Sequence, residues 1–219
     1  MSLNRSLLTV ASVLALTLGV VGCSSDSSPA SGAGGTNRQG NSDPVESAKA
    51  RVKFKEQGRF VRDLASALDL PRNEVCNELG LYDCYEAAHR ITLGGVEPYR
   101  RGIRDPLPVA PVTAPIAVDR VALTACATRV DRDFDTPSDA VMFKQLAEIG
   151  ANETTLEESA RTIYDRLLRR DATEGEVDSL VGFYDETVDA LEGTDEEPAR
   201  EWAIASCFAV ATTLEGLFY

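Results

Sequence analysis

Apolar residues recur at helical spacing along most of the chain. Beyond Gly58 they fall at i, i+1, i+4, i+7 and i+8 on one helix face, as Phe60, Val61, Leu64, Ala67 and Leu68. Shorter patterns predict a polar helix over residues 43–57 and further helices over residues 71–80, 83–95, 115–126 and 136–150. No segment shows the strict alternation of a strand, so the pattern predicts an all-α protein.

The C-terminal third has the clearest helical pattern. Thr155 is expected to cap a helix with one apolar face, formed by Ala160, Ile163, Tyr164, Leu167 and Leu168. Thr173 and Glu176 have the S/T-x-x-E spacing of a capping box, which predicts the start of the next helix. A last helix, opened by Pro198, is apolar on nearly all sides, so we expect it to be the central helix.

Prolines interrupt the helical pattern between residues 96 and 115. They are Pro98, Pro106, Pro108, Pro111 and Pro115. Because proline lacks an N–H donor and clashes with the preceding helical turn, the segment is predicted to be extended and polyproline-like. We interpret it as a strap across the helix bundle; the alternative is a flexible linker between two domains.

The amino-terminal pattern has a different character. Arg5 precedes an uncharged, mostly apolar run from Leu7 to Val21, and Gly22 and Cys23 follow. The run is shorter than the ~20 apolar residues of a membrane span, and it suits the apolar part of a signal peptide. The ending Val-Val-Gly-Cys resembles the lipobox of bacterial lipoproteins, which implies cleavage before Cys23 and lipid attachment to its thiol. An ordinary secretory signal is the alternative.

A polar segment rich in small residues, residues 24–44, separates this signal from the helical pattern. It has almost no large apolar residue, so we expect a disordered tether with ends ~25 Å apart. Ser24 follows the cysteine where inner-membrane lipoproteins carry Asp, so the resemblance implies an outer-membrane anchor, facing the periplasm, in a cell with two membranes. The predicted organisation is a signal peptide (1–22), a lipidated cysteine and tether (23–44) and one helical domain (45–219).

The charge of the chain restricts its partners. Residues 1–22 contain one Arg and no acid, so the remainder has 21 basic and 35 acidic residues and a net charge of −14. Such a surface repels nucleic acid and anionic lipid head groups. We therefore expect no nucleic-acid partner, and membrane contact through the lipid anchor alone.

Four cysteines follow the proposed anchor: Cys76, Cys84, Cys126 and Cys207. An even number in an exported chain favours disulfides, for which three pairings are possible. Closeness in sequence favours Cys76 with Cys84, which leaves Cys126 with Cys207 by elimination. A metal site is the alternative, but its usual tight cysteine and histidine spacings are missing from the sequence.

Two charged clusters are candidate sites. Asp131, Asp133 and Asp135, with Asp139 beyond them, have the alternating carboxylates of a calcium-binding loop. Thr136 and Met142 stand where such a loop needs Gly and Glu, so a solvated acidic loop is the simpler interpretation. The other cluster is basic and lies beside the prolines: Arg100, Arg101 and Arg104. It could bind an acidic partner or a phosphate, or pair with carboxylates of its own domain.

His89 is the single histidine, and Glu86 precedes it by three residues on the same predicted helix face. A Glu–His pair could support base catalysis, and a histidine could ligate haem. No nucleophile motif and no C-x-x-C-H motif accompanies it. A hydrogen-bonded structural histidine is therefore the favoured interpretation.

Residues 160–177 read A-R-T-I-Y-D-R-L-L-R-R-D-A-T-E-G-E-V. This stretch resembles a helix-turn-helix segment of large exported, haem-associated proteins of planctomycetes and myxobacteria, whose pattern is roughly R-x-L-Y-x-x-L-L-x-R-x-P-T-x-x-E. The chain departs from it at Ala172, where the pattern has proline. The end of the chain, from Trp202, also looks like the end of such segments. The resemblance implies a helical exported fold and assigns no functional residue.

The sequence thus predicts one irregular bundle of about six or seven helices with a proline-rich strap and disulfides. The favoured function is a non-enzymatic binding or scaffold lipoprotein that holds a partner protein at the cell envelope. The alternatives are an enzyme, or a haem or metal accessory protein, that works through carboxylates or His89, and a purely structural envelope protein.

Overall fold

The computed structural model describes residues 53–78, 82–106, 111–193 and 197–218. The chain divides after Ala48 into two units, and every described residue belongs to the second unit, Lys49–Tyr219. The predicted signal peptide, Cys23, the tether and residues 43–52 of the first predicted helix lie outside the described residues.

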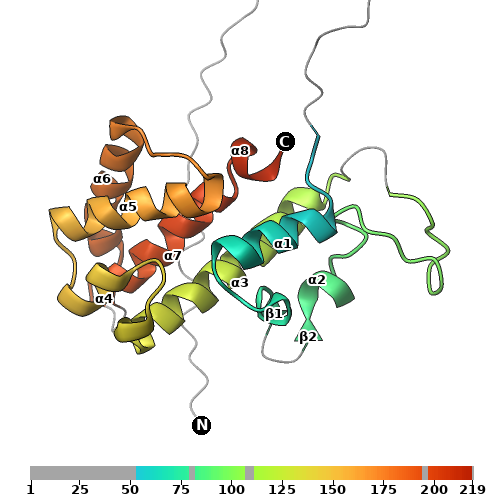
Figure 1. The fold of residues 1–219 in the computed structure, drawn as a ribbon, viewed down its shortest axis with the longest axis horizontal. Helices are drawn as coiled ribbons and strands as arrows, with labels where there is room; N and C mark the ends of the chain where they lie inside the picture. Colours follow the sequence, from blue (N-terminus) through green and yellow to red (C-terminus); the bar gives the residue numbers. More distant parts are fainter. Residues whose placement is uncertain (1–52, 79–81, 107–110, 194–196, 219) are drawn as a thin grey trace, which may run out of the picture. The chain divides into compact units, whose positions relative to one another are not determined.

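The described part of the chain is all-α, as predicted (Figure 1). Its order is α1 (Gln57–Ala67), the 3₁₀ turn η3 (Arg72–Glu74), β1 (Asn77–Glu78), β2 (Tyr82–Asp83), α2 (Cys84–Ala87), α3 (Ala114–Asp135), the 3₁₀ turn η4 (Pro137–Asp139), α4 (Lys144–Ile149), α5 (Glu153–Leu168), α6 (Glu174–Ala190), α7 (Pro198–Ala211) and α8 (Leu214–Leu217). Among these described helices, none has the length and apolar character needed to cross a membrane.

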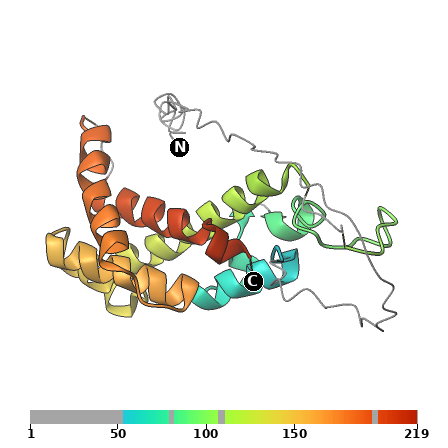
Figure 2. The ribbon, with the colours of Figure 1, turned by 90° about the horizontal axis from the view of Figure 1, so that it is seen from above.

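Helix α7 is the centre of the bundle. It packs against α3, α5, α6 and α8, and Figure 2 shows it lying alongside α3. Trp202 is fully buried, donates its indole N–H to the Leu180 carbonyl at 2.8 Å and meets the Tyr184 ring edge-on at 6.4 Å. The prediction that this apolar helix is central is therefore confirmed, because helices surround it and each one covers part of its apolar surface.

Two disulfides tie the fold together, in the pairing that the sequence favoured. Cys126 of α3 is bonded to Cys207 of α7, with their Cα atoms 5.8 Å apart. Cys76 is bonded to Cys84 across the short β1–β2 pair, with their Cα atoms 5.4 Å apart. The first bridge fixes the central helix to the longest described helix, and the second joins the two residues that flank the β1–β2 pair.

The predicted helices over residues 71–80 and 83–95 are wrong in extent. Residues 72–74 form only a 3₁₀ turn, and an antiparallel pair, in which Asn77 faces Asp83, follows it. Helix α2 stops after four residues, although Asp83 caps it as predicted by accepting from the Glu86 N–H at 3.2 Å. The residues between the two cysteines pair as antiparallel strands instead, and the Cys76–Cys84 bridge holds the two ends of this pair together.

The amino-terminal end of the described chain is extended and not helical. Phe54 forms an isolated antiparallel bridge with Phe218, their rings meet edge-on at 5.7 Å, and the Lys55 N–H donates to the Leu217 carbonyl at 2.8 Å. The predicted helix over residues 43–57 is thus wrong for residues 53–56. Contacts with residues far away in the sequence determine this conformation, and the local periodicity of apolar residues does not reveal such contacts.

Capping residues set the starts of α5 and α6. The Thr173–Glu176 capping box of α6 is present as predicted. For α5 the cap is Asn152, whose side chain accepts from the Thr155 N–H at 3.1 Å while the Thr155 hydroxyl accepts from the Asn152 N–H at 2.9 Å. Thr155 is therefore the third residue of the helix and not its cap, and α5 begins three residues earlier than expected.

Candidate interaction surface

The proline-rich segment forms a loop that stands out from the helices. Glu97 and Ile103 exchange two backbone hydrogen bonds, of 2.9 and 3.2 Å, and Gly102 supplies a positive φ of 69°. Figures 1 and 2 show the light green loop standing out beyond α2 in both views. The prolines do exclude helix from the described residues between 96 and 113, but residues 97–103 turn back on themselves and do not lie extended as predicted. Residues 107–110 lie outside the described residues.

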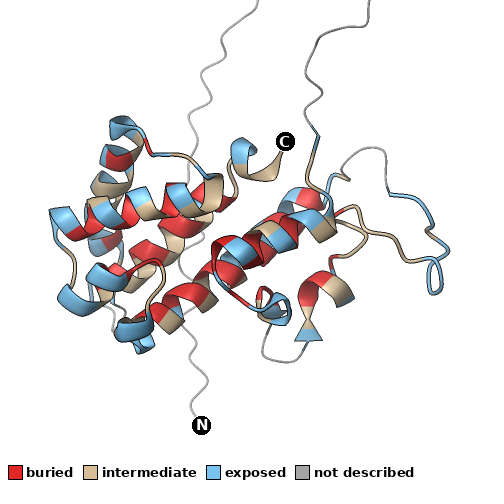
Figure 3. Ribbon diagram, in the orientation of Figure 1, coloured by how far each residue is buried: buried red, intermediate tan, exposed pale blue. Residues whose placement is uncertain are grey.

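Large apolar side chains of this segment face solvent. Tyr99 is 99% exposed, Val112 is 97% exposed and Ile116, in the first turn of α3, is 62% exposed. Figure 3 shows much of the projecting loop in the pale blue of exposed residues. A fully exposed aromatic ring forgoes the burial that usually stabilises such a side chain, so contact with another molecule would stabilise it.

The three candidate arginines lie in the same segment, and all are exposed. Arg101 pairs with Glu97, with a distance of 3.2 Å between Nε and Oε2. Arg100 and Arg104 make no ion pair with another described residue. Among the acids that the structure describes, only Glu97 therefore neutralises one of the three arginines. We call Tyr99, the three arginines, Val112 and Ile116 the strap surface.

The aspartates of the predicted calcium loop are helical, so the prediction of a loop is wrong. Asp131 and Asp135 lie in the last turns of α3 and pair with Arg200 of α7, at 2.8 and 3.1 Å. The Arg200 guanidinium also lies over the Phe134 ring, 5.3 Å from its centre. Asp139 belongs to η4. These carboxylates thus hold α7 against the end of α3.

Asp133 is fully buried, and its partners explain why. It pairs with Arg129 of the same helix at 2.7 Å and accepts backbone N–H groups from Val141, Met142 and Phe143 at 2.9–3.0 Å. The carboxylate therefore fixes the chain just before α4. Across the described ranges, no group of three or more His, Cys, Asp or Glu side chains is placed to hold a metal ion.

Glu86 is the acidic member of the predicted Glu–His pair. Glu86 forms an ion pair with Arg90 and accepts from the Gln57 side chain at 3.4 Å. Both charged residues line an open depression of about 260 Å³, together with Gly94 and Gly95. His89 is buried in the turn after α2, and its backbone N–H donates to the Cys84 carbonyl at 2.9 Å. This environment fits the structural histidine that the sequence favoured.

A charged clamp that sequence analysis missed joins α5, α6 and α8. Arg170 binds Glu176 at 2.7 Å and Glu215 at 2.8 Å, and its guanidinium lies 5.1 Å from the centre of the Tyr164 ring. Hydrogen bonds from Arg170 and Thr173 lower the pKa of Glu176 to about 2. The same arginine lowers the pKa of Glu215. The Glu215 partner lies 45 residues from Arg170, so helical spacing carries no signal for it.

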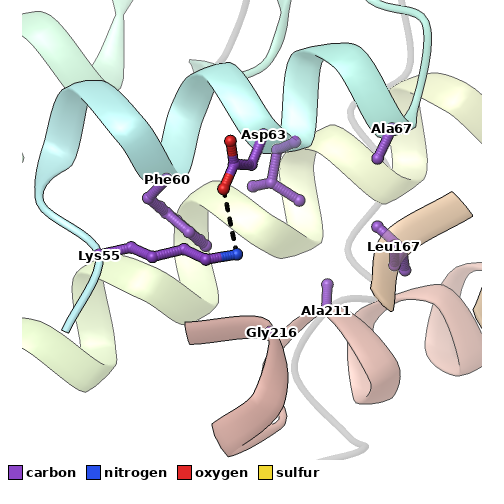
Figure 4. A pocket seen from close by; sticks show the side chains of 8 residues that line it. Lys55, Phe60, Asp63, Ala67, Leu167, Ala211 and Gly216 are labelled. Atoms are coloured by element: carbon purple, nitrogen blue, oxygen red, sulfur yellow. Dashed lines mark ion pairs between the residues drawn. The ribbon is translucent and has the colours of Figure 1, made fainter. Parts of the chain in front are cut away.

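Beside this clamp, a small cavity lies between α1, α5 and the C-terminal helices (Figure 4). Its volume is about 20 Å³, which is room for a single water molecule. Lys55 crosses it to reach Asp63 at 3.1 Å. A larger depression of about 230 Å³ adjoins it and shares Lys55, Asp63 and Leu167.

The surface described above therefore has one projecting apolar and basic segment, one depression beside α2 and one beside the end of α5. Comparisons of the chain with protein-family models, with curated proteins and with solved structures found no match.

Proposed function

We propose that this protein is a membrane-anchored lipoprotein that binds a partner protein at the cell envelope through the strap surface. The proposal assigns it no catalytic role. The anchor is the lipidated Cys23 inferred from the sequence, and the predicted tether, residues 24–44, would let the helical domain reach a partner near the membrane.

The exposure of Tyr99 is the observation that carries this proposal. An aromatic ring that is 99% exposed at the tip of a closed loop can bury most of its surface only against another molecule. Tyr and Arg are the residue types that contribute most to protein interfaces, and here Tyr99 precedes Arg100 and Arg101 directly.

The charges indicate what kind of partner would fit. Arg100 and Arg104 make no ion pair with described carboxylates, although the chain as a whole is strongly acidic. A partner with an apolar pocket bordered by carboxylates would cover Tyr99 and pair with these guanidinium groups. Repulsion from the remaining acidic surface would restrict an acidic partner to this segment.

Site-specific crosslinking in the native envelope tests this proposal. A photo-crosslinking amino acid in place of Tyr99 is expected to give one dominant adduct, and the same substitution at Val188, on α6, is expected to give none. The reversal Arg100→Glu with Arg101→Glu is expected to abolish the adduct, because it turns attraction for an acidic partner into repulsion.

A matched charge reversal controls for the change in net charge. Arg62→Glu with Lys144→Glu alters two exposed cations outside the strap surface and is expected to leave the adduct intact. An adduct that survives the Arg100 and Arg101 reversal, or none from Tyr99, would contradict the proposal.

A further inference from the structure

The depression of about 230 Å³ beside the C-terminal end of α5 is lined by side chains that donate hydrogen bonds. Its donors are Lys55, Ser66, Arg166 and Arg169. They come from the start of the described chain, from α1 and from the end of α5, so the fold brings together residues more than 100 positions apart. None of these side chains belongs to the strap surface.

The acids in the depression already have partners. Asp63 pairs with Lys55 at 3.1 Å, and Glu215 pairs with Arg170 at 2.8 Å. Arg166 donates its Nε–H to the Ala67 carbonyl at 2.7 Å, which caps the end of α1. Neither Arg166 nor Arg169 forms an ion pair with a described carboxylate. Two guanidinium groups that no described carboxylate neutralises thus line one depression.

Arg169 is held in an unfavourable backbone conformation. As the residue that ends α5 it has φ 58° and ψ 34°, the left-handed region in which glycine is the usual residue. A residue with a Cβ atom is strained in this region, because the Cβ lies too close to the following carbonyl oxygen. The chain therefore carries an arginine at a position where glycine would fit the backbone better, and a role for its guanidinium would account for this.

We propose that this depression binds a phosphate group, held by Arg166 and Arg169 with Lys55 and Ser66 at its edge. Paired guanidinium groups match the planar arrays of oxygen atoms that phosphate presents. The net negative charge of the domain does not prevent this, because solvent ions screen charges beyond about 8 Å at physiological ionic strength.

Phosphorus NMR of inorganic phosphate with the full chain in detergent tests the proposal. The phosphate signal is expected to broaden, and Arg169→Gly is expected to weaken binding about tenfold or more, the loss typical of one charge-assisted hydrogen bond. This variant also relieves the left-handed backbone, so its melting temperature is expected to stay the same or rise. The test thereby separates lost binding from lost folding.

Two variants serve as controls. Arg161→Gln removes one cation from the same helix, outside the depression, and is expected to retain phosphate broadening. Asp69 is the other described non-glycine residue with a left-handed backbone, at φ 50°. Asp69→Gly removes this backbone strain outside the depression and is also expected to leave the broadening of the phosphate signal unchanged. No broadening with the unaltered chain, or equal broadening with Arg169→Gly, would overturn the proposal.

Vesicles then identify the source of the phosphate group. If phosphatidylglycerol vesicles displace inorganic phosphate while phosphatidylcholine vesicles do not, the depression binds a lipid head group. If neither displaces it, the depression binds free phosphate. Both results support a phosphate site and differ only in its ligand.

Discussion

At the scale of single residues, Asp133 shows how one buried charge can organise a fold. Its carboxylate is fully buried, yet it has an arginine partner and three backbone donors from the segment before α4. Such a group stabilises only when all its partners are present, because an unpaired buried charge is costly. Neither Arg129 nor the backbone donors can be recognised from the D-x-D-x-D spacing, so the sequence predicted a solvated acidic loop, with calcium binding as the alternative.

Removing this carboxylate is expected to destabilise the protein strongly. Asp133→Ala leaves Arg129 buried without its partner, so we expect a loss of about 3–5 kcal/mol in the free energy of unfolding. Urea unfolding followed by circular dichroism measures it. Asp131→Ala is the control, because its exposed pair with Arg200 is expected to contribute less than about 1 kcal/mol. Equal losses in the two variants would contradict this account.

At the scale of elements, contacts between helices explain both the successes and the failures of sequence reasoning. Helices α1, α5, α6 and α7 were predictable because each repeats its apolar positions over several turns, and α3 was predicted only as far as residue 126, although it continues to Asp135. Residues 71–95 were not, because a disulfide and a two-residue strand pair determine their path. The strap surface could be chosen from its prolines and arginines, but the closed loop depends on Gly102 and on pairing between Glu97 and Ile103.

The clamp between α5, α6 and α8 is expected to make stability depend on pH. The pKa of Glu176 is about 2 in the folded chain, against an ordinary value of 4.5. Its contribution is therefore complete above pH 4.5 and is lost as the pH falls toward 2. Glu176→Gln should lower the melting temperature at neutral pH, and the difference from the unaltered chain should shrink across this window.

The control for Glu176→Gln is the loss of a surface carboxylate outside the clamp. Glu158→Gln removes an exposed carboxylate of α5 that makes no ion pair with a described residue. It is expected to leave the melting temperature unchanged within about 1 °C across the same pH range. If the difference in melting temperature between Glu176→Gln and the unaltered chain stays constant down to pH 2, the ionised Glu176 carboxylate is not the source of the stabilisation.

The two disulfides are expected to contribute differently to the free energy of unfolding. In the chain-entropy account a longer closed loop gives more stabilisation: about 4.5 kcal/mol for Cys126–Cys207 and about 2.5 kcal/mol for Cys76–Cys84. Double substitution of each pair by alanine, followed by urea unfolding, measures the two losses. A larger loss for Cys76–Cys84 would contradict the inference that the α3–α7 bridge is the main constraint.

At the scale of the whole molecule, an acidic helical domain bears an exposed aromatic and basic segment and a separate cluster of unneutralised arginines. Hydrophobic periodicity could predict that the domain is helical, because burial of apolar faces dictates it. It could not predict the depression lined by Arg166 and Arg169, because side chains meet there from α1, α5 and α8. Long-range packing produces such sites, and a sequence pattern reports only local order.

Membrane anchoring through Cys23 is the central claim of this account, because the proposed function depends on it. Intact-mass spectrometry of the protein extracted from the membrane fraction of its native cell tests this claim most directly. The account predicts a chain that begins at Cys23 and carries covalently attached acyl groups. A chain that retains residues 1–22 with an unmodified Cys23 thiol, recovered from the soluble fraction, would contradict it.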